Sequence, residues 1–131
     1  MYKLFLDDVR TPFNCSKYMH TKLGPDNLIY LEDDWVIVRN FDDFKIAVRT
    51  YGIPNIVSFD HDLADMMYDP ETHTESFTYK EQDGSVCAKW LMEFCEEHEK
   101  YPDKIWIHSA NVWGRKRIRD IITDFNQQAY G

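Results

Sequence analysis

The sequence predicts one α/β domain, a three-layer sandwich in which helices cover both faces of a mostly parallel sheet of four to five strands. Three observations lead to this prediction. The chain has 131 residues, the size of one ordinary domain. Strand-like and helix-like patterns alternate along it, and the strand-like runs are apolar without alternation, as in sheets that are covered on both sides. We therefore expect residues 1–131 to fold as a single unit.

Four short apolar runs predict the strands. Each is rich in aliphatic and aromatic residues and ends at polar residues, which is typical of a buried strand that reaches the edge of its sheet. The runs are YKLFL at 2–6, DWVIVRN at 34–40, NIVSF at 55–59 and KIWIH at 104–108.

Three helices are predicted between and after these strands. The first begins after Asn40, which can cap it, and ends before Gly52. The second covers 84–100. The third begins at about Val112, and its apolar residues follow the helical spacing i, i+3, i+4, i+7: Ile118, Ile121, Ile122 and Phe125.

Two segments show no clear period. Residues 9–27 contain two prolines and a glycine and are expected to form a loop with at most a helical turn. Residues 64–83 are polar and dotted with aromatic side chains, and they are long for a connection in a compact domain. Long loops of this kind often act as functional lids.

Composition narrows the class of protein. The formal net charge of −8 argues against a protein that coats nucleic acid through a broadly basic surface, although a local phosphate site is compatible with it. No apolar run is long enough to span a membrane, and the first ten residues do not resemble a signal peptide. The three cysteines have no C-x-x-C spacing, so reduced thiols in a cytoplasmic protein are expected.

Polar clusters follow three of the predicted strands. Asp7, Asp8 and Arg10 follow the first, and Asp60, His61 and Asp62 follow the third. The fourth ends in His108, Ser109 and Asn111. In a parallel sheet ligands bind outside the carboxyl ends of the strands. If the strand order is 2-1-3-4, as in flavodoxin-like folds, these three strands are neighbours and the clusters meet in one crevice.

The residue types in these clusters suggest two kinds of chemistry. Neighbouring carboxylates repel each other unless a hard divalent cation lies between them, so Asp7, Asp8 and Asp60 are candidate ligands for Mg²⁺ or Mn²⁺. Two histidines, His61 and His108, are suited to give and take protons near neutral pH. Such a pair fits the cleavage of a cyclic phosphodiester.

Basic residues at the start of the last helix support a phosphate ligand. The run GRKRIR places Arg115, Lys116, Arg117 and Arg119 where the helix dipole favours negative charge. Arg115 and Arg119 are four residues apart and are expected to clamp a phosphate. Trp113 is expected to cover a base or ribose. A solvated face with salt bridges to nearby acids is the alternative reading of the basic run.

Three blocks of the sequence, LFLDDVRTP, VSFDHDL and IHSANVWG, resemble the signature motifs of the cyclic-phosphate processing receiver-like domains of bacteria and their phages. The resemblance implies a receiver-like fold, a bacterial or phage-infected cytoplasm, and a ligand that is a small cyclic nucleotide or an RNA end with a 2′,3′-cyclic phosphate. It implies catalytic roles for Asp60, His61, Asp62 and His108. It adds Arg10, Ser109, Asn111 and Gly114 to Trp113, Arg115 and Arg119 as residues that bind the substrate.

Two other functions fit the same residues. A phosphoacceptor receiver domain would use Asp60 as the acceptor and Ser109 as the switch hydroxyl, but it needs a lysine at the end of a fifth strand. After the fourth predicted strand we expect only a helix, and the two histidines have no place in that mechanism. A protein that sequesters a cyclic nucleotide without turnover is the other alternative. The sequence predicts neither the substrate nor the oligomeric state.

Overall fold

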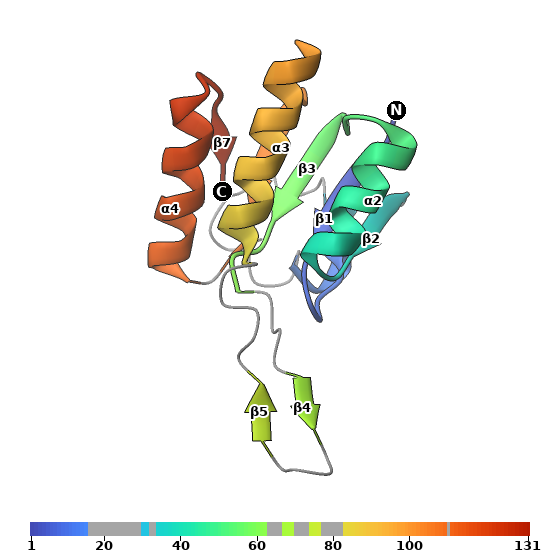
Figure 1. Ribbon diagram of the computed structural model, residues 1–131, viewed down its shortest axis with the longest axis vertical. Coiled ribbons are helices and arrows are strands. Elements are labelled where there is room, and N and C mark those ends of the chain that lie inside the picture. The colour runs from blue at the N-terminus through green and yellow to red at the C-terminus, as the bar shows by residue number, and fades with distance from the viewer. Residues whose placement is uncertain (16–29, 32–33, 63–66, 70–73, 77–82, 110) are drawn as a thin grey trace.

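A computed structural model of the chain has a five-stranded parallel sheet at its centre (Figure 1). The structure describes residues 1–15, 30–31, 34–62, 67–69, 74–76, 83–109 and 111–131. The strand order β2-β1-β3-β6-β7 contains the predicted order 2-1-3-4 and confirms the receiver-like fold class. Across the sheet the strands are β2 (Trp35–Val38), β1 (Lys3–Leu6), β3 (Ile56–Phe59), β6 (Lys104–Ile107) and β7 (Ala129–Tyr130).

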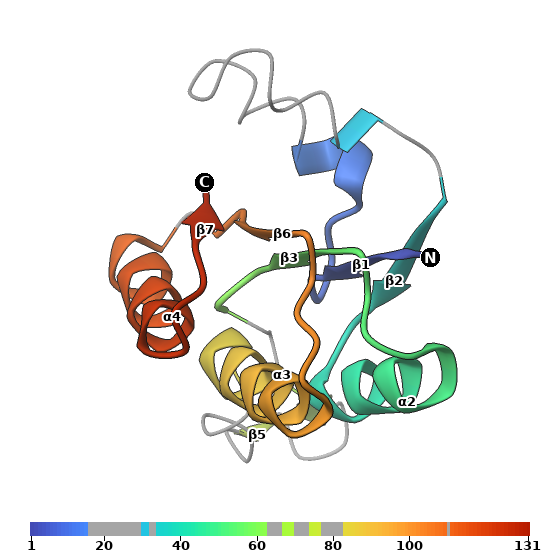
Figure 2. The same cartoon turned by 90° about the horizontal axis from the view of Figure 1, so that it is seen from above.

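Helices α2 (Phe41–Tyr51), α3 (Gly84–His98) and α4 (Val112–Asp124) pack on the same face of the sheet, and a helical turn at residues 12–15 lies on the other face (Figure 2). Asn40 caps α2 as predicted, since its side chain accepts a hydrogen bond of 2.8 Å from the backbone of Asp43. Of the predicted loop at 9–27, the part after residue 15 lies outside the described residues.

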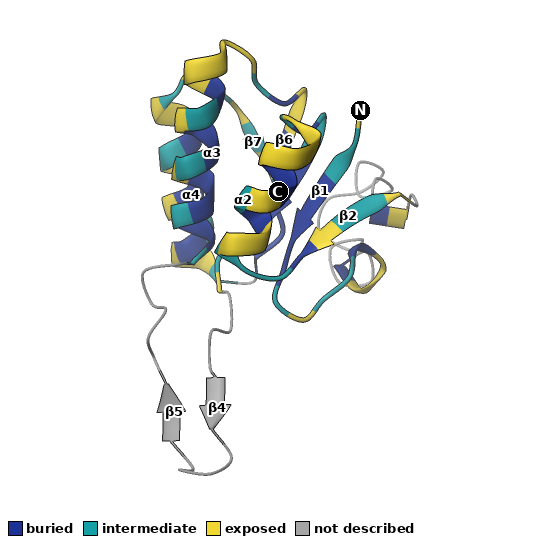
Figure 3. Ribbon diagram, turned by 45° about the vertical axis from the view of Figure 1, so that its right-hand side comes forward, coloured by how far each residue is buried: buried dark blue, intermediate teal, exposed yellow. Residues whose placement is uncertain are grey.

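The strands bury side chains on both faces, which explains why they are apolar without alternation. Leu4 and Leu6 pack under the three helices, whereas Phe5 between them faces a second core on the opposite side. Figure 3 shows that the helices are buried on the side that faces the sheet and exposed on the opposite side. The members of the second core are Phe5, Cys15, Tyr30 and Trp106.

Two features differ from the prediction. A fifth strand, β7, follows α4 and pairs with β6, so the expectation that only a helix follows the fourth strand was wrong. Two residues are too few to show a period, and this explains the error. Within the long polar segment 64–83, β4 (Met67–Asp69) and β5 (Thr74–Ser76) form an antiparallel pair. Residues 64–66, 70–73 and 77–82, and with them the expected lid, lie outside the described residues.

Among the helices that the structure describes, none is both long and apolar enough to cross a bilayer.

Candidate functional site

The three polar clusters meet at the carboxyl edge of the sheet, as the sequence predicts. Their first members follow immediately after the neighbouring strands β1, β3 and β6, and the backbone N–H of each still bonds to the next strand. These bonds continue the sheet by one residue and fix the position of each side chain. They run from Asp7 to Val38 (3.1 Å), from Asp60 to Leu6 (3.0 Å) and from His108 to Phe59 (2.9 Å).

Asp7 is completely buried and is held as an anion by four donors. Its Oδ1 accepts hydrogen bonds from the backbone N–H groups of Val9 (3.0 Å) and Arg10 (2.8 Å). Its Oδ2 lies 3.1 Å from Arg10 Nε and 3.1 Å from His108 Nε2. Burial raises the pKa of this carboxyl, but the hydrogen bonds from His108 and from the backbone outweigh it and hold the pKa well below its usual range.

His108 is enclosed in a chain of buried hydrogen bonds. Its Nδ1 lies 2.6 Å from Ser58 Oγ, and Ser58 Oγ lies 2.7 Å from the hydroxyl of Tyr30. The ring stacks on Phe5 with 4.4 Å between ring centroids. Burial lowers the pKa of His108. A neutral ring that donates from Nε2 to the Asp7 carboxylate must accept at Nδ1, so Ser58 donates to His108 and Tyr30 donates to Ser58.

Asp60 is buried but poorly compensated. Its Oδ1 lies 3.5 Å from Arg10 Nη2, and its Oδ2 has no hydrogen-bond partner among the described residues. Burial and the negative charge of Asp7 raise the pKa of Asp60 to about 7, with smaller contributions from Asp8 and Asp62, and the Arg10 guanidinium opposes this rise. Asp60 therefore gains or loses its proton near neutral pH, whereas Asp7 stays charged.

The predicted metal ligands lie close enough together to share an ion. One carboxylate oxygen each from Asp7, Asp8 and Asp60 lie within 4.8 Å of one another. Oxygen ligands and clustered negative charge suit a hard divalent cation, and the unpartnered Asp60 Oδ2 offers a ligand atom. The residues thus fit Mg²⁺ or Mn²⁺, although Arg10 already neutralises part of the same charge.

His61 stands beside these acids in a more open environment, with 14% of its side chain exposed. Its Nδ1 lies 2.9 Å from Asp62 Oδ1, and its Nε2 lies 3.3 Å from Asp83 Oδ2 without hydrogen-bonding geometry. The ring packs on the backbone of Gly114, where a Cβ atom would overlap it. Gly114 is therefore at the site because only a glycine leaves room for the imidazole.

Asn111 connects this histidine to α4. Its Nδ2 donates to both oxygens of Asp62, at 3.1 and 3.2 Å, and its Oδ1 accepts a bond of 2.9 Å from the backbone of Gly114. Ser109 is buried and accepts a bond of 3.1 Å from the Asn111 backbone. These side chains cap the helix and orient the Asp62 carboxylate that contacts His61.

Arg115 and Arg119 of α4 have different environments. Arg115 is half-buried next to Gly114. The guanidinium of Arg119 instead donates to the carbonyl oxygen of Gly131, at 2.7 Å, so its described hydrogen bond connects α4 to the end of the chain beyond β7. The structure therefore gives no contact in which these two arginines act together. Trp113 is 80% exposed at the first turn.

Four residues of the site were missed in the sequence. Asp83 caps α3 and reaches His61. Arg39 donates to two carbonyl oxygens of the loop 7–10, at 3.1 and 2.6 Å. Tyr30 and Ser58 complete the chain of hydrogen bonds behind His108. Ser58 alone carried a signal, because a hydroxyl inside an otherwise apolar central strand needs a partner.

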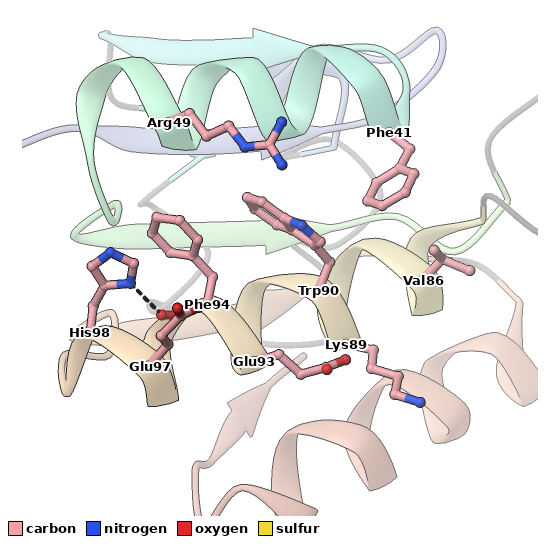
Figure 4. Close-up of a pocket in the computed structure, with 9 residues that line it drawn as sticks. All are labelled: Phe41, Arg49, Val86, Lys89, Trp90, Glu93, Phe94, Glu97 and His98. Carbon is pink, nitrogen blue, oxygen red and sulfur yellow. Dashed lines mark hydrogen bonds between the residues drawn. The ribbon is translucent and has the colours of Figure 1, made fainter.

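A cavity of about 670 Å³ lies elsewhere, between α2 and α3 (Figure 4). Trp90 lines it, stacked on Phe94 with 5.2 Å between centroids, and the Arg49 guanidinium lies 5.5 Å from the Trp90 ring. None of the three polar clusters lines this cavity. Aromatic side chains that pack between α2 and α3 line this cavity. We therefore assign it to helix packing and not to the candidate active site.

Comparison with known proteins agrees with the geometry. The sequence model of one family, described as "Cyclic-phosphate processing Receiver domain", matches residues 2–124. A search among curated proteins finds no match. The matched range contains all three polar clusters.

Replacing Asp60 with asparagine should stabilise the metal-free protein at high pH. Because the pKa of Asp60 is about 7 in the folded protein and 3.8 ordinarily, the folded state binds its proton more tightly and stability falls as pH rises through this interval. Asp60→Asn removes that loss. We expect the variant to gain about 2–4 kcal/mol over the wild type between pH 5 and pH 8, measured by urea unfolding in EDTA.

The exposed Asp103→Asn variant is the control, since it removes one negative charge away from the three clusters. Its difference from the wild type reports the charge change alone. An Asp60→Asn variant whose stability relative to the wild type is the same at both pH values contradicts the environment described for Asp60.

Proposed function

Since the chain belongs to the cyclic-phosphate processing receiver family, we propose that it hydrolyses a cyclic phosphodiester to a phosphomonoester. The observation that carries this proposal is the buried Asp60 carboxyl, whose pKa is about 7 and which lies 3.5 Å from the Arg10 guanidinium, with the His61 imidazole next to it in the chain at the carboxyl edge of the sheet. The guanidinium suits a phosphate, and the two side chains suit the proton transfers that hydrolysis needs.

His61 is the proposed general base. In the proposed step Nδ1–H donates to Asp62, the Asp83 carboxylate that lies 3.3 Å from Nε2 moves aside, and Nε2 then takes a proton from the attacking water. The water oxygen bonds to phosphorus while one ring P–O bond breaks. Protonated Asp60 then gives its proton to the leaving oxygen, which becomes the free hydroxyl of the product. Arg10 and Arg115 balance the charge that grows on the phosphate oxygens.

His108 takes a different role in this scheme from the one expected. We expected His61 and His108 to share the acid and base work, but both ring nitrogens of His108 are engaged and its side chain is fully buried. We propose that it is a positioning residue, which holds the Asp7 carboxylate. Asp7 in turn orients Arg10 and raises the pKa of Asp60.

A divalent cation has a defined place in the proposal. Asp7, Asp8 and Asp60 are the residues that would hold it. When bound it would supply positive charge near the phosphate. Asp60 would then remain ionised, and the proton for the leaving oxygen would have to come from His61 or water.

Phosphorylation of Asp60 is the second candidate function, favoured by its unpartnered buried oxygen beside Asp7 and Asp8. The fifth strand on which that reading depends is present, but β7 and the residue after it read Ala129, Tyr130 and Gly131, with no lysine. The missing lysine and the placement of His61 favour hydrolysis over phosphorylation.

Replacing His61 with alanine should lower kcat by about 10²–10⁴, the usual contribution of a general acid or base. The measurement is steady-state hydrolysis of 2′,3′- and 3′,5′-cyclic nucleotides, with and without EDTA. His98→Ala is the matched control, because His98 is an exposed imidazole at the far end of α3. Wild-type turnover that survives in His61→Ala rules out the proposed base. Tight binding without turnover in the wild type supports the sequestering alternative.

Calorimetric titration with MgCl₂ or MnCl₂ tests the metal ligands. We expect wild-type protein to bind one ion and Asp8→Asn to bind at least ten times more weakly, because a charged ligand is lost. Asp103→Asn, an exposed acid outside the cluster, should bind as the wild type does. Equal affinity of Asp8→Asn and wild type excludes this ligand set.

A further inference from the structure

A groove between α3 and α4 contains Trp113 and takes no part in the proposed hydrolysis step itself. These helices lie side by side on one face of the sheet (Figure 1). The groove has a volume of about 590 Å³, within the range of small-molecule sites. Its lining combines one tryptophan, one aliphatic side chain, three cations and two acids: Trp113, Ile121, Lys89, Lys116, Arg117, Asp120 and Asp124.

The groove begins beside the candidate active site because both helices begin there. The first residue of α3, Gly84, packs on the backbone of Asp60, and its N–H donates to the carbonyl of His61 at 2.8 Å. In the first turn of α4, Gly114 packs on the His61 ring. Trp113 is its direct neighbour in the chain and lines the groove.

The charged side chains of the groove change from basic near the candidate active site to acidic farther along α4. Lys89 is five residues from Gly84, and the cations of α4 are two and three residues from Gly114, so they lie within about 8 Å of the active-site end at 1.5 Å of rise per residue. Asp120 and Asp124 lie about 9–15 Å along α4, and Asp120 pairs with Lys116 at 2.8 Å. The near part of the groove therefore attracts a phosphate, and the far part repels a second one.

Trp113 is the side chain that gives the groove its specificity. A tryptophan that is 80% exposed on a helix contributes little to the core, so folding does not account for it. Indole faces stack on nucleobases, and nearby lysine and arginine side chains bind the phosphates between them. An aromatic platform beside cations, next to a phosphate-processing site, matches a nucleotide unit.

We propose that the α3–α4 groove binds the nucleotide adjacent to the cyclic phosphate, with its base stacked on Trp113 and its phosphate near Lys89 and Arg117. The substrate is then a short oligoribonucleotide that ends in a 2′,3′-cyclic phosphate, and not a free cyclic mononucleotide, which has no second unit to place in the groove. This inference rests on the proposed function, and it extends that function to the substrate class.

The test compares 2′,3′-cyclic AMP with a triadenylate ending in a 2′,3′-cyclic phosphate. We expect the wild type to prefer the trinucleotide in kcat/KM, and Trp113→Ala to lower this preference by about 5- to 150-fold, the effect of losing one stacked base. Trp113→Phe should retain most of it. Val112→Ala is the matched control, because Val112 is an exposed apolar neighbour that does not line the groove. Lys89→Ala should reduce the salt dependence of trinucleotide binding by one phosphate contact.

Equal kcat/KM for the two substrates in the wild type, or an unchanged preference in Trp113→Ala, overturns the inference while leaving hydrolysis intact. If neither substrate is hydrolysed, the proposed function fails, and anisotropy with the labelled trinucleotide decides about the groove. Binding that Trp113→Ala weakens supports it, and binding that Trp113→Ala leaves unchanged overturns it. A wild-type dimer that Trp113→Ala dissociates, seen by light scattering, also overturns it, because Trp113 is then an interface between copies.

Discussion

The buried carboxylate of Asp7 is the interaction on which the site depends. An anion with no exposed surface is tolerated only where donors replace its water, and Asp7 has two backbone N–H groups, Arg10 and His108. Each donor is thereby fixed as well. The loop after β1 is bent around one oxygen, and the Arg10 side chain is aimed across the sheet edge toward Asp60.

The same charge separates the roles of the two central acids. Among the described residues, Asp7 takes most of the hydrogen bonds, whereas its neighbour Asp60 has one guanidinium 3.5 Å away and one oxygen without a hydrogen-bond partner. Burial and the negative charge of Asp7 together raise the pKa of Asp60 to about 7. One carboxyl of the site therefore stays an anion, and the other has a pKa near neutral pH. Pairs of carboxyls with separated pKa values are typical of acid–base catalysis. The two histidines also differ, since His108 is fully buried and bonds to Asp7, whereas 14% of the His61 side chain is exposed.

Much of the fold and part of the site could be predicted from the sequence. Continuous apolar runs such as Val57–Phe59 indicated a sheet covered on both faces, and the polar residues after three of these runs predicted where they would meet. The exceptions have physical reasons. Strand β7 is too short to show a period, and Ser58, Tyr30 and Asp83 act through contacts between segments far apart in the chain. The different roles of His61 and His108 depend on burial, which a strand-end motif does not encode.

We infer that neutral His108 holds the Asp7 anion in place through a hydrogen bond and does not exchange protons with a substrate. Nitrogen-15 NMR of histidine-labelled, metal-free protein measures this directly, because the shifts of the two ring nitrogens report the tautomer and its titration. We expect a His108 ring that is protonated at Nε2 and bare at Nδ1 at pH 8, and that takes up a second proton only below its ordinary pKa of 6.5, because burial lowers the pKa. A His108 ring that is protonated at Nδ1 at pH 8, or that takes up a second proton above pH 6.5, would contradict this expectation.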